Sequence, residues 1–304
     1  MAIRNRFSEL LPEITAWRRD IHENPELLFE TTRTSQFVTD RLAEFGCDEI
    51  VTGIGRTGVV ALIKGRSDSK GKVVGLRADM DALPIEEATG LPYASKTPGV
   101  MHACGHDGHT AMLLGAAKYL AETRNFDGTV AVIFQPAEEG GGGGLEMCKD
   151  GMMERFGIDE VYGMHNWPGR PIGTFAIRPG PFFAATDTFE IVIEGKGGHA
   201  AKPNETVDSI VMAAQCVTTL QTIAARNADP VEQIVVSVTS FESSSKAFNV
   251  IPQSVTFRGT VRTLTPEMRA LGRDRIHDIC THTAAVFGGV AHITYIEGDR
   301  KSVV

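Results

Sequence analysis

Apolar residues near the N-terminus recur at helical spacing. Those that form the pattern are Leu10, Leu11, Ile14, Trp17 and Ile21. The sequence His-Glu-Asn-Pro at residues 22–25 breaks this pattern, which resumes over residues 31–45. Because a period near 3.6 places apolar side chains on one face, the pattern predicts two helices joined by a short loop.

Continuous apolar runs follow and alternate with helical sequence. The runs that predict strands are residues 59–63, 73–79, 129–135 and, more weakly, 160–165. An Ala- and Leu-rich helix is expected at residues 110–122, between the second and third runs. Strands that alternate with helices are typical of an α/β layered domain, so we expect a mainly parallel central sheet.

The pattern changes after the Pro-Gly-Pro sequence at residues 179–181. The expected elements are a strand at 188–194, a helix at 208–226, strands at 233–241 and 254–263, a helix at 266–287 and a strand at 290–296. This β-α-β-β-α-β order is that of the ferredoxin-like unit, which forms a compact domain by itself. We therefore place a domain boundary near residues 180–186.

Composition narrows the class of protein. The 304 residues include 30 basic and 38 acidic ones, which give a net charge of −8, and no Lys/Arg run exceeds two residues, so we expect no nucleic-acid partner. No apolar run has the roughly 18 residues of a membrane span, and the charged N-terminus does not resemble a secretory signal. The five scattered cysteines favour a reducing compartment, so we expect a cytoplasmic protein.

The densest candidate chemistry lies at residues 101–109, Met-His-Ala-Cys-Gly-His-Asp-Gly-His. Thiolate, imidazole and carboxylate groups are the ligands of borderline metals, and the start of a helix favours the thiolate. The alternative is a capped helix start with a buried free cysteine. The density of ligand-type residues in one loop favours a metal site.

Further ligand-type residues follow other predicted strands. Asp79 and Asp81 lie at the end of the predicted strand 73–79. Glu138 and Glu139 follow the strand 129–135, and His165 lies at the end of the strand 160–165. Buried carboxylates are costly unless paired or metal-bound, although a solvated loop is the alternative for the two glutamates. Residues 140–144 are all glycine but lack the Gly-Lys-Ser/Thr of a phosphate-binding loop, so we expect them to allow close backbone approach. All these sets lie at carboxyl ends of strands, where open α/β sheets place their sites.

Six sequence motifs, which occur in this order along the chain, resemble those of a known enzyme family. They are WRRDIHENPEL, LRADMDALP, MHACGHDGHTAMLLGAA, QPAEEGGGG, GMHNWP and GKGGHAAKP. Together they resemble the metal-dependent amidohydrolases of the aminoacylase and carboxypeptidase superfamily, and most of all its hippurate hydrolase and N-acyl-amino-acid amidohydrolase branch. The resemblance implies an α/β catalytic domain of the zinc-aminopeptidase type with an inserted ferredoxin-like lid. We expect the catalytic domain at residues 1–185, the lid or dimerisation domain at 186–297 and an aberrant tail at 298–304.

The resemblance also implies roles for single residues. The metal ligands would be Cys104, His106, Glu139 and His165. Glu138 would be the general base, and Asp81 would orient the site from behind the ligands. In the lid, His199 would reach the active site of a partner in a homodimer and polarise the substrate carbonyl. Asn249 and, more weakly, Arg262 would hold the substrate carboxylate. Without the resemblance these three would be interpreted as a turn histidine, a strand-end asparagine and an exposed strand arginine.

The implied activity is hydrolysis of the amide bond of N-acyl or N-aroyl amino acids such as hippurate. One or two divalent ions would serve as cofactor, with Mn, Zn, Co and Ni all open because the mixed ligand set does not select one. The nearest enzymatic alternative is a dipeptidase or carboxypeptidase. A metal-storage protein is disfavoured because storage needs no base such as Glu138 beside Glu139.

The chain ends directly after the last lid strand. The resemblance implies a further segment that returns to the catalytic domain, completes its sheet and supplies another histidine ligand. His277, His282 and His292 all fall on predicted lid elements and do not replace that ligand. We therefore expect either an amidohydrolase that tolerates an incomplete ligand set or an inactive fragment of one, with impaired activity as the prediction.

Overall fold

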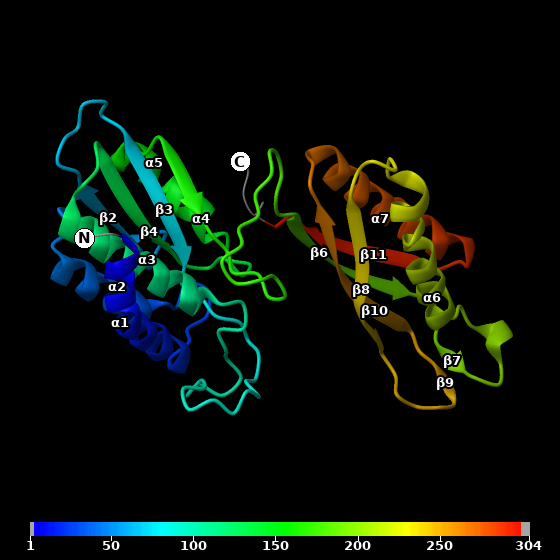
Figure 1. Ribbon diagram of the computed structural model, residues 1–304. Coiled ribbons are helices and arrows are strands. Elements are labelled where there is room, and N and C mark those ends of the chain that lie inside the picture. The colour runs from blue at the N-terminus through cyan, green and yellow to red at the C-terminus, as the bar shows by residue number, and fades with distance from the viewer. Residues whose placement is uncertain (1–2, 299–304) are drawn as a thin grey trace. The chain divides into compact units, whose positions relative to one another are not determined.

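The computed structural model describes residues 3–298, which form two compact units that join between Ile172 and Gly173 (Figure 1). The sequence places the domain boundary near residues 180–186, and the first strand of the second unit begins at Ala185. Of the predicted tail at residues 298–304, only Gly298 lies within the described residues.

The first unit contains a five-stranded sheet. In spatial order its strands are β1 (Glu49–Ile54), β2 (Gly58–Lys64), β4 (Thr129–Gln135), β3 (Val73–Asp79) and β5 (Glu160–Gly163). Strand β3 pairs in parallel with both β4 and β5, whereas β2 pairs antiparallel with both β1 and β4. Only β2 therefore runs against the other four strands, and the prediction of a mainly parallel central sheet is confirmed.

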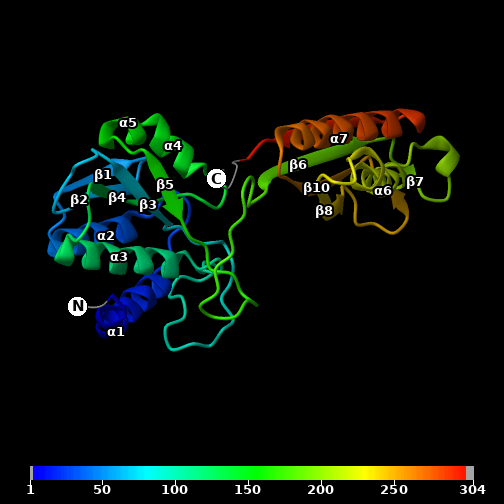
Figure 2. The ribbon, with the colours of Figure 1, turned by 45° about the horizontal axis from the view of Figure 1, so that its top comes forward.

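Helices cover both faces of this sheet (Figure 2). On one face lie α1 (Ile3–Glu23), α2 (Thr32–Phe45) and α3 (His106–Thr123), and on the other lie α4 (Gly143–Lys149) and α5 (Met152–Phe156). Alternate residues of β4 pack against the helices on opposite faces of the sheet, because successive side chains of a strand point to opposite sides. Val132 and Phe134 pack in the core with Trp17 of α1, whereas Ile133 packs with Met147 of α4.

The carboxyl ends of three parallel strands set the position of the candidate site. Strands β3, β4 and β5 end at Asp79, Gln135 and Gly163, and because they are parallel these ends meet at one edge of the sheet. Helix α3 begins at His106, four residues before the predicted start at residue 110. His106 and His109 therefore lie in its first turn.

The second unit has the predicted β-α-β-β-α-β order. Its main elements are β6 (Ala185–Glu194), α6 (Ser209–Leu220), β8 (Ile234–Ser243), β10 (Ser254–Thr263), α7 (Pro266–Val286) and β11 (Val290–Ile296). The sheet order is β11-β6-β10-β8 with every pair antiparallel, so the predicted ferredoxin-like order of elements is confirmed. Sequence reasoning missed a small ribbon of β7 (Gly198–His199) and β9 (Val250–Ile251) and the short turn η1 (Pro203–Glu205). The last part of the helix predicted at 208–226 is instead the π-helical η2 (Ile223–Asn227).

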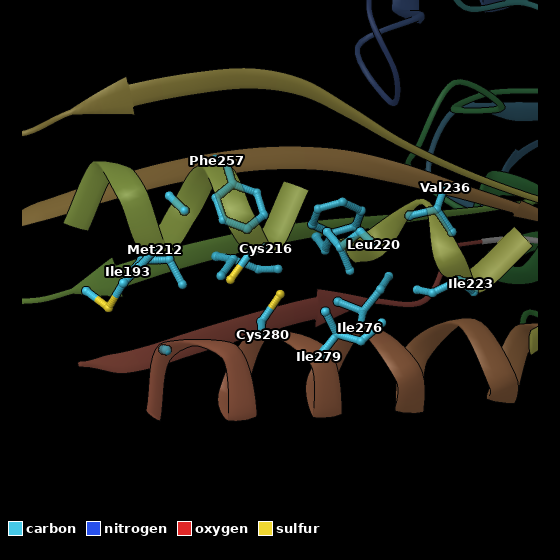
Figure 3. Close-up of a cluster of buried hydrophobic side chains, with 14 of the residues drawn as sticks. Ile193, Met212, Cys216, Leu220, Ile223, Val236, Phe257, Ile276, Ile279 and Cys280 are labelled. Carbon is cyan, nitrogen blue, oxygen red and sulfur yellow. The ribbon is translucent and has the colours of Figure 1, made fainter. Parts of the chain in front are cut away.

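Both helices of this unit pack on one apolar core (Figure 3). Ile193 and Phe257 from the sheet meet Met212 and Leu220 from α6, and Ile276 completes the cluster from α7. Helix α6 begins at a cap in which the Asp208 carboxylate accepts the amides of Ile210 and Val211. The second unit therefore has a hydrophobic core made of its own residues.

Two findings bear on the predictions from composition. Among the described residues, no helix is both long and apolar enough to cross a membrane. The five cysteines, all within residues 3–298, form no disulfide.

Candidate metal centre

The buried carboxylate of Asp81 holds the segment that carries the two glutamates. Its Oδ1 accepts the backbone N–H of Glu138 and its Oδ2 that of Glu139, each at 3.0 Å. Asp81 is 1% exposed, so these two bonds satisfy a carboxylate that would otherwise be costly to bury. The main chain of both glutamates is thereby fixed at the edge of the sheet.

The glycine tract lets the chain fold closely around this segment. Ala137 precedes Glu138 in the left-handed region, with a φ of 50°. A Cβ at Gly143 would lie 1.8 Å from the carbonyl oxygen of Pro136, and one at Gly141 would lie 2.5 Å from the Cβ of Ala137. The tract therefore allows close backbone approach beside the glutamates, in agreement with the prediction from the sequence.

His106 lies at the centre of the site and is fully buried. Its Nδ1–H donates to the carbonyl oxygen of Asp81 at 2.8 Å, which leaves Nε2 as the free ring nitrogen. That Nε2 lies 3.9 Å from Glu138 Oε2 and 3.8 Å from Glu139 Oε1. The imidazole is thus oriented toward both glutamates.

Cys104 and His165 form the other side of the site. The Sγ of Cys104 lies 3.3 Å from Nε2 of His165. The Nδ1–H of His165 donates to the carbonyl oxygen of Asn166 at 2.7 Å, so Nε2 is the ring nitrogen that faces Cys104. The thiol of Cys104 and the imidazole of His106, from one loop, therefore converge with the imidazole of His165 from another segment.

The charges of the site favour a cation. Burial alone would lower the pKa of His106, but its interactions with Asp81, Cys104 and Asp79 outweigh it and raise that pKa to about 11. Burial, together with the neighbouring imidazoles of His109 and His106, holds the pKa of His165 below its ordinary value. The field of the carboxylates therefore attracts positive charge to the space around His106.

The donor atoms fit a metal ion. Three triads have ligand atoms within 4.8 Å of one another: Cys104–His106–His165, His106–Glu138–Glu139 and Asp79–His106–His109. Within residues 3–298, His106 Nε2 and Glu139 Oε1 are buried atoms without a hydrogen-bond partner. Two atoms that each lie about 2.1 Å from one tetrahedral ion are about 3.4 Å apart, which is close to the separations measured here.

The third triad differs from the other two because two of its members, Asp79 and His109, are already bonded to each other. Asp79 Oδ1 accepts the Nδ1–H of His109 at 2.6 Å, and Asp79 Oδ2 accepts Nη1–H of Arg77 at 2.7 Å. The sequence singled out Asp79 as a ligand-type residue at a strand end and His109 as part of the dense set at 101–109, but assigned neither of them a specific role. Their pairing has no local signal, because the two residues are 30 positions apart.

The lid residues lie in the second unit. His199, on β7, pairs in register with Val250 of β9, and the carbonyl of Asn249 accepts the amide of Ala200 at 3.0 Å. His199 and Asn249 are therefore neighbours and are exposed. Arg262 lies near the C-terminal end of β10, whereas Asn249 precedes the N-terminal end of that strand at Ser254. At about 3.3 Å per residue, Arg262 is roughly 25 Å along the strand from Ser254. Its guanidinium donates to the carbonyl of Val261.

Residues 75–291 match the model of peptidase family M20/M25/M40. Hippurate hydrolase of Campylobacter jejuni is 46% identical over 273 residues, which cover 90% of this chain and 70% of that enzyme. Thermostable carboxypeptidase 2 of Saccharolobus solfataricus is 41% identical over 97% of this chain and 75% of its own length. The crystal structure of a dinuclear metal-binding M20 peptidase from Bacillus subtilis superposes on this chain with a TM-score of 0.76 and 37% sequence identity. The superposition covers 97% of this chain and 77% of that peptidase.

These matches identify the class of the protein as a metal-dependent amidohydrolase, which confirms the class predicted from the sequence. The chain belongs to peptidase family M20/M25/M40.

Proposed function

We propose that this chain hydrolyses the amide bond between an acyl or aroyl group and an amino acid, with hippurate as a representative substrate. The observation that carries the proposal is the position of Glu138 Oε2, 3.9 Å from Nε2 of His106, among side chains suited to hold a metal. The 46% identity to a hippurate hydrolase supports the substrate class.

Cys104, His106, Glu139 and His165 would hold one or two divalent ions, and Mn, Zn, Co and Ni all suit this mixed set of donors. The dinuclear metal binding named for the related M20 peptidase of Bacillus subtilis supports a site for two ions, and the donors of the Cys104–His106–His165 and His106–Glu138–Glu139 triads are close enough to share them. A divalent ion held there supplies Lewis-acid chemistry, in that it lowers the pKa of water and polarises a carbonyl.

Glu138 would act as the general base and then as the general acid. Its carboxylate takes one proton from the attacking water as the oxygen of that water bonds to the amide carbon. When the C–N bond breaks, the same carboxyl returns the proton to the leaving nitrogen, so that the products are a carboxylic acid and a free amino acid. Asp81 would support both steps because its bond to the Glu138 amide, at 3.0 Å, fixes the start of that side chain.

In the lid, His199 would polarise the scissile carbonyl in the site of a second copy, and Asn249 with Arg262 would hold the substrate carboxylate. The adjacency of His199 and Asn249 across the β7–β9 ribbon supports a shared task for these two. Arg262 is the weaker candidate because it lies at the other end of β10.

A homodimer through the lid would bring His199 into that position. Strand β8 is an edge of its sheet, and its Val235 and Phe241 are 52% and 43% exposed. Ile210 and Val211 on α6 are 42% and 50% exposed, so apolar surface is available on the same unit for a second copy. Sedimentation of the chain would give a dimer, and Val235→Lys would shift it to monomer. A wild-type chain that is monomeric at all concentrations would exclude this role of His199.

The experiment that tests the activity is hydrolysis of hippurate by the chain after chelation and reloading with each of the four ions. We expect no release of glycine from the chelated chain and restored release with at least one ion. A chelated chain as active as the reloaded one, or no hydrolysis with any of the ions, would overturn the proposal.

A second candidate is a carboxypeptidase or dipeptidase, which the 41% identity to a thermostable carboxypeptidase supports. Both activities would use the same centre, so substrates must separate them. If kcat/KM is higher for N-benzoylglycine than for unblocked dipeptides the first proposal stands, and the reverse order favours the peptidase.

We also propose a cytoplasmic location. The five cysteines without a disulfide support it, because thiols persist in reducing compartments. A fractionation that recovers the native protein outside the cytoplasm would contradict this location.

A further inference from the structure

A chain of hydrogen bonds leads from the sheet to the candidate ligand His165. It begins at Asp79, the last residue of β3, whose Oδ2 accepts the Arg77 guanidinium at 2.7 Å and whose Oδ1 accepts Nδ1–H of His109 at 2.6 Å. Asp79 and His109 are 1% and 3% exposed. A buried carboxylate with both oxygens bonded fixes the ring of His109 and places its proton on Nδ1.

The next link follows from that tautomer. With Nδ1 protonated, Nε2 of His109 is an acceptor, and it accepts the backbone N–H of Asn166 at 3.1 Å. The side-chain Oδ1 of Asn166 contacts the same nitrogen, and this contact becomes a second N–H···N bond when the amide is turned so that its NH2 group faces Nε2. The carbonyl of Asn166 in turn accepts Nδ1–H of His165 at 2.7 Å, which leaves Nε2 of His165 toward Cys104.

Asn166 also interlocks with the loop that carries the other candidate ligands. Gly105, between Cys104 and His106, has a φ of 100°, and a Cβ there would lie 2.6 Å from Oδ1 of Asn166. The Asn166 side chain thus occupies the space that a larger residue at 105 would need. Two segments that are 61 residues apart in the sequence contact each other at this point.

We propose that Asp79, His109 and Asn166 are positioning residues that fix the tautomer and ring orientation of His165 so that its Nε2 faces the metal. This inference rests on the proposed function, in which His165 is a ligand. His109 itself is excluded as a ligand in this arrangement because both of its ring nitrogens are bonded to protein groups. Residues behind a ligand that orient it commonly affect metal affinity by about 10- to 100-fold.

The test measures metal affinity, not only activity. His109→Phe keeps a ring of similar shape and removes both hydrogen bonds, so we expect Mn²⁺ to bind about 10- to 100-fold more weakly in a chelator competition. In the metal-free protein, the ring ¹⁵N shifts of His165 should show protonated Nδ1 in the wild type and a mixture of tautomers in the variant. At saturating Mn²⁺ the KM for hippurate should stay within about twofold of the wild-type value.

Two other variants keep the proposal falsifiable if His109→Phe does not fold. Asn166→Ala keeps both backbone bonds of residue 166 but removes its side-chain contacts with His109 and with the space at Gly105, and should still weaken Mn²⁺ binding by about tenfold. His109→Gln offers an amide oxygen near the position of Nε2 and should recover part of the affinity that His109→Phe loses.

Thr110→Val is the matched control. Thr110 is buried beside His109 and donates to the backbone carbonyl of Asp79 at 2.8 Å, outside the chain to His165. Its removal should lower the melting temperature but leave the Mn²⁺ affinity within about twofold. Wild-type affinity and an unchanged His165 tautomer in folded His109→Phe and Asn166→Ala would overturn the proposal. A failure of the proposed function is distinguishable, because it would appear as no Mn²⁺ bound by the wild type, or as Mn²⁺ binding unaffected by His106→Ala.

Discussion

The carboxylate of Asp81 lies directly behind Glu138, with its Oδ1 3.0 Å from the backbone nitrogen of that residue. Its other oxygen makes the same bond to Glu139, and its own carbonyl accepts the Nδ1–H of His106. One buried residue therefore orients the proposed base and two proposed ligands.

Asp81→Asn should disrupt this arrangement without changing its size. The new amide group would face one of the two backbone N–H groups as a second donor, and a buried donor without an acceptor costs about 1–3 kcal/mol. We expect a lower melting temperature and a kcat/KM for hippurate reduced by about 10- to 100-fold. Steady-state kinetics at saturating metal and a thermal melt measure the two effects.

Asp159→Asn is the control for this variant. Asp159 also accepts a backbone amide, that of Val73 at 2.9 Å, but it is at the surface and belongs to no part of the site. Its change should leave kcat/KM within about twofold of wild type. Equal losses in both variants would mean that Asp81 acts on general stability alone.

Gly143→Ala tests the close approach of the glycine tract. A Cβ at this position would lie 1.8 Å from the backbone oxygen of Pro136, which cannot rotate away as a side chain can. The strain should displace the segment before Glu138 and lower kcat/KM by at least about tenfold, while the metal stays bound. This magnitude follows from the sensitivity of catalysis to displacements of about 1 Å.

Gly144→Ala provides the comparison at the neighbouring position. Its Cβ would meet only the end of the Gln135 side chain, at 3.0 Å, so the strain is smaller. We expect activity within about threefold of wild type. If both variants retain full activity, the tract does not position Glu138.

A pH-dependent contribution to stability is expected in the second unit. Burial by itself would raise the pKa of Asp187, but hydrogen bonds from Arg269, from the Tyr295 hydroxyl at 2.7 Å and from the Gly298 amide at 3.0 Å outweigh it and hold the pKa below its ordinary value. A lowered pKa stabilises the fold fully above the unfolded value of about 3.9, and this stabilisation is lost as the pH falls through the lowered pKa.

Asp187→Asn should therefore cost on the order of 3 kcal/mol of unfolding free energy near pH 7, because it leaves the largely buried Arg269 without its charge partner. The difference from wild type should shrink below about pH 4 in urea titrations. Glu190→Gln is the control, since its pair with Arg258 is about half exposed and should contribute less than about 1 kcal/mol. A loss at Asp187 that is the same at both pH values would contradict this account.

The sequence predicts much of the fold because its signals are local. Apolar runs identify β2, β3 and β4, and helical spacing identifies α1 and α2. Strand β1 was not predicted, because only one of its six residues is buried and its sequence shows no apolar alternation. Helix α4 was not predicted, because it begins inside the glycine tract, where helix propensity is low. The order of strands in the sheet depends on pairings between distant segments and has no local signal.

The candidate site shows the same division. Carboxyl ends of parallel strands meet at one edge, so the sequence could bring His106, Glu138 and His165 into one neighbourhood. The partners of His109 could not be predicted, because they lie 30 and 57 residues away and are selected by hydrogen-bond geometry. A motif therefore indicates which residues gather, whereas the bonds behind them appear only in the folded chain.

The most direct test of the central claim compares wild type with Glu138→Gln in the hydrolysis of hippurate, with bound Mn²⁺ counted in both. The account predicts equal Mn²⁺ per chain and a kcat lower by about 10²- to 10⁴-fold in the variant, because a general base contributes on that order. A variant that hydrolyses hippurate at the wild-type rate, or that loses its metal along with its activity, would contradict the assignment of Glu138 as the base.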